Sequence, residues 1–164
     1  MPAAKSPKPR TTDRAPSSPH GTAAWLAVVR AYNLCDAVMT ARLAAIGLRV
    51  GGHEVLATIA TTPGITQQAL AARCFVAKSG VSMLLTQMEA RGWVRRDSDG
   101  ADARVRRLTL TDDGMAMAQK CLAVQAEMVT AMVAPATRDE LDLVADVMGR
   151  VAVTLEGMRA ELKG

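Results

Sequence analysis

The ordered pattern over residues 63–114 constrains the fold of this chain more than any other feature of its sequence. It begins with a proline-glycine turn, after which Thr66 is a good helix N-cap, because its hydroxyl can accept a hydrogen bond from a free backbone N–H. Ile65 and Leu70 stand at the spacing of a hydrophobic staple around that cap. These residues predict a short helix that starts at residue 67 and ends at residue 73 or 74.

A second helical pattern follows after a short connection at residues 75–77. Its apolar residues recur at helical spacing, and Gly92 can take the left-handed position that ends many helices. Two short helices joined by a short turn form a helix-turn-helix. The residues that this pattern turns inward are Val81, Leu84, Leu85 and Met88.

A hairpin comes next, because residues 93–96 and 104–110 can pair as two strands around the polar tip of residues 97–103. Residues 91–107 contain six arginines against three aspartates, a net charge of +3. The whole chain of 164 residues carries a formal net charge of +4 and has a pI near 9.3. The basic charge is therefore concentrated beside the second helix, which favours a polyanionic partner.

The outward face of the second helix consists of small and hydrogen-bonding side chains, with a cation near its start. Such a face fits the major groove of DNA, where hydroxyl and amide groups can meet base edges. Gly80 favours this interpretation, because a glycine inside a helix costs about 1 kcal/mol relative to alanine and often marks a close approach to the backbone. An ordinary solvent-facing helix is the alternative. The candidate DNA-binding residues of this helix are Lys78, Ser79, Gly80, Ser82, Met83, Thr86 and Gln87.

The hairpin supplies a second set of candidate DNA contacts. An arginine at its tip can enter the minor groove, and Asp102 could hold Arg104 in place by a bidentate pair. The alternative is a solvated hairpin whose charges only keep it soluble. The candidates on the hairpin are Arg95, Arg96, Asp102, Arg104 and Arg106.

Taken together, these residues resemble the MarR family of winged helix-turn-helix transcription regulators, over roughly residues 22–162. The motifs are PGITQQALA at residues 63–71, SGVS at 79–82, MEARGWVRR at 88–96, DGADAR at 99–104 and LTLTDDG at 108–114. Their order and spacing are more specific than any one of them. The resemblance implies an obligate homodimer, with recognition helices in successive major grooves and wing arginines in the flanking minor grooves. It also implies that Arg104 is the wing-tip arginine and Asp102 its acidic partner.

Both terminal regions predict long helices that support such a dimer. Residues 22–46 have apolar side chains every three or four positions, Thr111 can cap a further helix, and the last helix carries an apolar heptad seam. One small winged module leaves too little surface for both terminal helices, so we favour exchange between two chains over packing within one. The seam residues are Leu141, Val144, Met148, Val151, Leu155, Met158 and Leu162.

The expected fold class is mainly α with a small β-wing. We predict a winged helix-turn-helix at residues 53–110 and dimerisation helices at 21–46 and 112–162, in a single domain of residues 21–164. Glycines at 47, 51 and 52 are expected to interrupt the chain before a short helix over residues 53–60. Residues 1–20 form a basic, proline-rich tail that is expected to be disordered, and either adds phosphate contacts or has no role.

The resemblance also implies an effector pocket between the dimer helices and the winged module. Trp25, Tyr32, Met39 and His53 are candidates only by that placement. Burial in a core is the more frequent role of such residues at helical spacing. Alternatively, His53 could titrate near neutral pH and bind an anionic effector.

Cys35 raises the alternative of oxidant sensing, because a subset of the same family uses a cysteine in the first helix. The adjacent Asp36 would oppose thiolate formation, and no cluster of hydroxyl groups accompanies Tyr32, so structural burial is favoured. No cofactor and no metal site are expected, since the cysteines are widely separated and His53 is the only histidine outside the tail. For the same shortage of groups, we do not expect an enzyme.

The expected function is a sequence-specific DNA-binding transcription regulator. We expect a repressor that binds a palindromic operator as a homodimer and is released by a small-molecule effector. The sequence shows neither an apolar run of membrane-spanning length nor a secretory signal, which favours the cytoplasm and no membrane partner. The alternatives are a thiol-based regulator acting through Cys35, an enzyme's dimerisation domain, and a winged helix that makes protein contacts without DNA. The end of the chain after its last helix argues against the enzyme.

Overall fold

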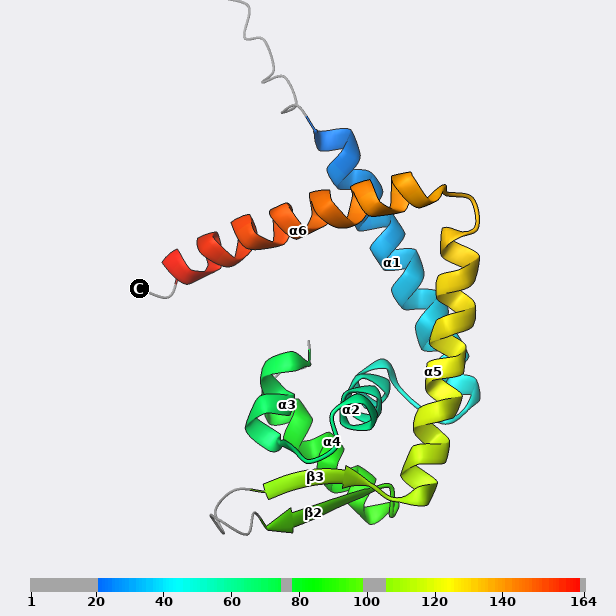
Figure 1. Ribbon diagram of the computed structural model, residues 1–164, viewed down its shortest axis with the longest axis vertical. Coiled ribbons are helices and arrows are strands. Elements are labelled where there is room, and N and C mark those ends of the chain that lie inside the picture. The colour runs from blue at the N-terminus through cyan, green and yellow to red at the C-terminus, as the bar shows by residue number, and fades with distance from the viewer. Residues whose placement is uncertain (1–20, 75–77, 99–105, 163–164) are drawn as a thin grey trace, which may run out of the picture. The chain divides into compact units, whose positions relative to one another are not determined.

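The computed structural model describes residues 21–74, 78–98 and 106–162. The elements in chain order are α1 (Thr22–Ala45), α2 (Val50–Thr61), β1 (Ile65–Thr66), α3 (Gln67–Arg73), α4 (Lys78–Ala90), β2 (Val94–Ser98), β3 (Arg106–Leu110), α5 (Asp112–Val133) and α6 (Arg138–Glu161) (Figure 1). The chain divides into two compact units, Met1–Asp36 and Ala37–Gly164. The observed class, mainly helical with one small antiparallel sheet, confirms the predicted fold class.

The core of the second unit lies around α2, which contacts α4, α5 and β3. Figure 1 shows α2, α3 and α4 gathered beside the sheet, with α5 running away from it. Each large apolar side chain that is fully buried there contributes roughly 1.5–3 kcal/mol to folding through removal from water. The fully buried side chains include Leu43, Val55, Leu56, Leu70, Val81, Leu85 and Leu108.

The sheet has three antiparallel strands in the order β1-β3-β2. Ile65 of β1 pairs with Leu108 of β3, and Leu108 pairs on its other side with Arg96 of β2. The hairpin of β2 and β3 was predicted, whereas the two-residue strand β1 was not. A pairing this short has no periodic pattern of its own, because it depends on a partner more than forty residues away.

Local capping residues set the helix boundaries as predicted. The Thr66 hydroxyl accepts a hydrogen bond from Ala69 N at 3.2 Å, and the Thr111 hydroxyl accepts one from Gly114 N at 3.1 Å. Gly92 has φ +71° and follows the end of α4, as the left-handed C′ position requires. The predicted helix-turn-helix is therefore confirmed in its boundaries.

Two predicted boundaries were wrong. The helix α2 begins at Val50 instead of residue 53, so Gly51 and Gly52 lie inside it and do not interrupt the chain. Gly52 packs closely against the turn that follows α1, because a Cβ built on it would lie 3.0 Å from Leu48 Cδ1. In the hairpin, Asp97 and Ser98 belong to β2 and pair with Arg107 and Arg106, so the first strand extends two residues beyond its predicted end.

The last helix, α6, is capped but unburied. Thr137 N donates to Glu140 Oε2 at 2.8 Å, and Glu140 N donates to Thr137 Oγ1 at 3.4 Å, which together form a capping box. The hydrogen bonds that the Glu140 carboxylate accepts from the Thr137 backbone N–H and from the Thr137 hydroxyl lower the pKa of this carboxyl. None of the residues of α6 is buried, so its apolar side chains have no core to occupy in the single chain.

In the first unit, the described residues are the N-terminal part of α1. Their apolar side chains are largely exposed, with Trp25 62% and Tyr32 69% exposed. Burial was the favoured role for both, and in the single chain that prediction is wrong. Among the described residues no single helix is long and apolar enough to cross a membrane; α1 and α2 together, bent at the break between them, meet only the length and composition criteria.

Candidate nucleic-acid interface

The predicted reading face of α4 is on the surface of the second unit. Val81, Leu85 and Met88 hold the opposite face of the helix in the core, at helical spacing. This packing leaves a face of small and hydrogen-bonding side chains toward solvent. The exposed members are Ser79, Ser82, Met83, Thr86 and Gln87, while Gly80 is half-buried. The side chain of Lys78 lies outside the described residues.

The end of α4 is fixed to the wing and to α5. Trp93 N donates to Met88 O at 2.9 Å, which closes the turn at Gly92. The Thr111 hydroxyl donates to Gly92 O at 2.5 Å, and Thr111 N donates to Trp93 O at 3.0 Å. Helix α4, the first wing strand and the start of α5 are thus joined by hydrogen bonds to the backbone.

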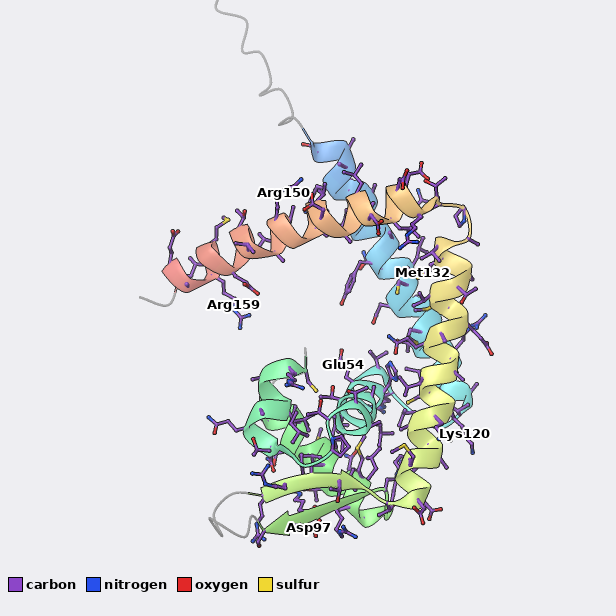
Figure 2. All side chains as sticks on the ribbon, viewed as in Figure 1. Glu54, Asp97, Lys120, Met132, Arg150 and Arg159 are labelled. Atoms are coloured by element: carbon purple, nitrogen blue, oxygen red, sulfur yellow. The ribbon has the colours of Figure 1, made fainter. Side chains whose placement is uncertain are left out.

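The outward face of the wing carries an acidic side chain that orients its neighbours. The Nε of Arg95 donates to Asp97, with both carboxylate oxygens at 3.0 Å, and the Thr109 hydroxyl lies 3.3 Å from Asp97 Oδ2. Figure 2 labels Asp97 on the sheet. Because the Arg95 side chain is 68% exposed, this ion pair orients the guanidinium but contributes little to stability.

Two further arginines extend the basic surface from β3. Arg106 donates to the Ser98 hydroxyl at 2.6 Å, and Arg107 donates to Gly64 O at 3.1 Å. Both arginines are exposed. The second of these hydrogen bonds links the wing to the turn before α3, so the basic strand and the helix-turn-helix are held together. Arg107 was not among the predicted DNA-binding residues, although the run of six arginines in residues 91–107, to which it belongs, was the signal that could have found it.

Arg96 differs from the other wing arginines, because its side chain is only 22% exposed. Its Nε lies 2.8 Å from Glu89 Oε2, and its two terminal nitrogens donate to Gln67 Oε1 at 3.5 Å and Thr86 Oγ1 at 3.3 Å. The predicted DNA-binding residues Asp102 and Arg104 lie outside the described residues, so their pair stays a prediction.

A pocket of about 290 Å³ adjoins α4 on the side of the turn between α1 and α2. Arg91 lies over the Trp93 ring at 4.9 Å from its centroid, at one edge of this pocket. The predicted effector residues do not line it. Its lining residues are Gly47, Leu48, Arg49, Gly52, Met83, Leu84, Gln87, Met88, Arg91 and Trp93.

The predicted effector residues Met39 and His53 are both buried. Burial lowers the pKa of His53, and a hydrogen bond to the Gln125 side chain opposes that effect in part. His53 Nδ1 has no hydrogen-bond partner within the described structure. The environment therefore favours a neutral histidine that packs in the core, which was the favoured role for this residue.

The three cysteines are free thiols, and a redox role of Cys35 stays a prediction. Cys35 is half-buried, and burial raises the pKa of the Cys74 and Cys121 thiols. A raised pKa keeps a thiol protonated and unreactive. Within the described ranges, no group of three histidine, cysteine or acidic residues could hold a metal ion.

The helix pair α3–α4 and its three-stranded sheet define a winged helix-turn-helix. Residues 47–105 match the family model described as MarR family. An uncharacterized HTH-type transcriptional regulator of Bacillus cereus is 29% identical over 105 residues, covering 64% of this chain and 69% of the relative. Transcriptional regulator HosA of Escherichia coli is 42% identical over 62 residues, covering 38% of this chain and 46% of HosA.

Solved structures share the fold at low identity. AbsC, a MarR family transcriptional regulator from Streptomyces coelicolor, has a TM-score of 0.76 at 22% identity, over 83% of this chain and 94% of AbsC. A mutant MarR from E. coli complexed with operator DNA has a TM-score of 0.69 at 20% identity, over 82% of this chain and 99% of the MarR chain. PcaV from S. coelicolor in complex with its natural ligand has a TM-score of 0.66 at 22% identity, over 86% of this chain and 97% of PcaV.

The family match and these relatives confirm the resemblance predicted from the sequence. Residues 47–105 are similar to the MarR family, and the relatives of similar sequence are named transcriptional regulators. The prediction that the chain is no enzyme agrees with these relatives, which are named transcriptional regulators.

Proposed function

We propose that this protein is a repressor that binds a palindromic DNA operator as a homodimer and is released by a small-molecule effector. The observation that carries the proposal is the exposed polar face of α4 together with the exposed Arg95 and Arg106 of the wing. Hydroxyl and amide side chains on α4 can reach base edges, while the arginines meet phosphates or the minor groove. The MarR mutant complexed with operator DNA, which has the same fold, supports this use of the surface.

The homodimer is supported by apolar side chains that the single chain leaves exposed. On α6, Val144, Leu155 and Met158 are 58%, 57% and 56% exposed, and they lie on the predicted heptad seam. Exposed apolar residues in a periodic row are typical of an interface and are costly to leave in water. A second copy of the same helix would cover the seam by two-fold symmetry.

Repression and release complete the proposal. A dimer that occupies a promoter blocks polymerase by its presence alone. The PcaV structure in complex with its natural ligand supports a small-molecule effector, whose binding residues stay a prediction from the sequence. The cytoplasm is the proposed location.

A gel-shift assay with salt titration tests DNA binding. We expect the logarithm of the binding constant to fall linearly with the logarithm of salt concentration, with a slope of about −0.9 per phosphate neutralised. A flat salt response would instead indicate a winged helix that makes protein contacts alone. Footprinting on the DNA that flanks the gene should then show two-fold symmetric half-sites about one helical turn apart, and candidate effectors should reduce the footprint.

A further inference from the structure

We propose that Arg96 and Thr86 are positioning residues that clamp the recognition helix α4 to the wing, and that neither one reads DNA. The proposal rests on the proposed DNA-binding function and revises the predicted set of DNA contacts. It is carried by one cluster of four side chains from three elements: Gln67 of α3, Thr86 and Glu89 of α4, and Arg96 of β2.

The strand register places Arg96 on the inner face of the sheet. Side chains alternate along a strand, so Arg96 shares a face with Val94, which is 4% exposed. Its direct partner across the pair is Leu108, which is fully buried. The guanidinium therefore leaves the strand toward α3 and α4, where its three partners lie.

Each nitrogen of the Arg96 guanidinium has a partner on a helix. The Nε forms an ion pair with Glu89 at 2.8 Å, although this N–H is not aligned for a hydrogen bond. The terminal nitrogens donate to Gln67 at 3.5 Å and to Thr86 at 3.3 Å. A planar guanidinium can hold three partners at once because its donors are fixed in a fork, which a lysine ammonium cannot reproduce.

The Thr86 hydroxyl is also committed inside the protein. It donates its single proton to Ser82 O at 3.1 Å, one turn earlier in α4, and accepts from Arg96. A base edge that needs a donor would have to displace the first of these hydrogen bonds. Ser79, Ser82, Met83 and Gln87 remain as the exposed residues of α4 for the reading role.

Arg95 provides a matched control one residue away. It points to the outer face of the same strand, where it is 68% exposed and its partner is Asp97 on the wing itself. Its ion pair therefore does not connect the wing to α4. A substitution of Arg95 removes a positive charge from the basic surface, whereas a substitution of Arg96 removes the connection between elements.

The two roles have different salt signatures. Removing one phosphate contact from each protomer makes the salt slope shallower, because fewer counterions are released on binding. A loosened α4 keeps the same phosphate contacts but must be ordered on binding, which reduces affinity at every salt concentration. A positioning residue is therefore recognised by reduced affinity at an unchanged salt slope, and a phosphate-contacting residue by a shallower salt slope.

The test compares the full-length Arg96→Lys, Arg96→Met and Arg95→Gln variants on a duplex selected by the wild-type chain from a random library. Arg96→Lys keeps the charge but removes the fork, so we expect a roughly tenfold reduction of affinity with the wild-type salt slope. Arg95→Gln should reduce the magnitude of the slope by about 0.9 per protomer. If Arg96→Lys binds like the wild type and Arg96→Met lowers the slope as Arg95→Gln does, Arg96 contacts phosphate and the proposal is wrong.

A second measurement, made without DNA, tests whether Arg96 and Glu89 interact in the folded protein. In a double-mutant cycle of Glu89→Gln and Arg96→Met, followed by urea unfolding, the decrease in midpoint of the double variant should be smaller than the sum of the two single decreases. Strictly additive decreases would overturn the clamp, whatever the DNA results. If the wild-type chain selects no duplex and shows no salt-dependent binding, the proposed function fails while this cycle still decides the role of Arg96.

Discussion

At Gly114, the first turn of α5 passes so close to the end of the recognition-helix turn that only a hydrogen atom fits on the Cα. A Cβ built there would lie 1.9 Å from the Trp93 carbonyl oxygen and 2.8 Å from its carbon. Both neighbours are backbone atoms, which cannot rotate away as a side chain can. The same carbonyl accepts from Thr111 N, so it is held in place.

We therefore expect Gly114→Ala to destabilise the protein by about 1–3 kcal/mol, because the backbone must shift to admit the methyl group. Urea unfolding measures the decrease in stability. Gly157→Ala is the matched control, since nothing lies within 4 Å of a Cβ at that position of α6. The control should gain up to about 1 kcal/mol from helix propensity. Equal effects of the two substitutions would remove the steric explanation.

Gln87 is the exposed amide of α4, and its position on the reading face assigns it a role different from that of a wing arginine. Gln87→Ala should change the preference among DNA sequences, because an amide can pair with a base edge. Arg104→Ala should instead weaken binding on most sequences. Affinities measured on a panel of single-base operator variants distinguish these effects. A uniform decrease from Gln87→Ala across the panel would exclude it from base reading.

At the scale of elements, α6 presents the largest contrast between local order and lack of burial. Its capping box and 24 residues define a helix, yet none of them is buried. The exposed seam residues Val151 and Leu155 are 42% and 57% exposed. Off the seam, Val153 is 69% exposed, so exposure by itself does not identify the interface.

Val151→Glu together with Leu155→Glu should give monomers that no longer bind an operator tightly, since two buried charges per helix oppose association. Sedimentation velocity measures the oligomeric state. Val153→Glu makes the same chemical change outside the heptad seam and should leave a dimer. Dimers of the seam variant, or monomers of the control, would contradict the predicted register.

At the scale of the whole molecule, α2 joins the winged module to α5, and His53 lies at this junction. The residue is 6% exposed, and its lowered pKa means that protonation favours the unfolded chain. Between the folded and unfolded pKa values the unfolded state binds more protons, so stability rises with pH in that window. Above the usual histidine pKa the full stabilisation is present.

Stability should therefore decrease as the pH falls below the usual histidine value of about 6.5. Thermal unfolding measured across this range, with His53→Gln as the comparison, isolates the contribution of one side chain. The variant remains neutral, so its unfolding temperature should depend less on pH than that of the wild type. Parallel pH profiles of the two proteins would show that His53 does not couple protonation to folding.

Local chemistry in the sequence determined where α3 and α5 begin and where α4 ends. Thr66, Thr111 and Gly92 act within a few residues of their own positions, through capping hydrogen bonds and a backbone conformation that favours glycine. Helical periodicity likewise identified the buried face of α4, because its members are neighbours on one helix. The ordered combination of these patterns was sufficient for the family resemblance.

Only the tertiary structure decided which side chains on the predicted surface are available to a partner. Arg95 and Arg96 are adjacent and identical in the sequence, yet pairing with β3 turns one outward and directs the other to α3 and α4. The strand β1 and the close approach at Gly114 likewise depend on distant partners. Capping and periodicity act between near neighbours, whereas register and packing join residues that are far apart along the chain, and for that reason only the folded structure distinguishes the two arginines.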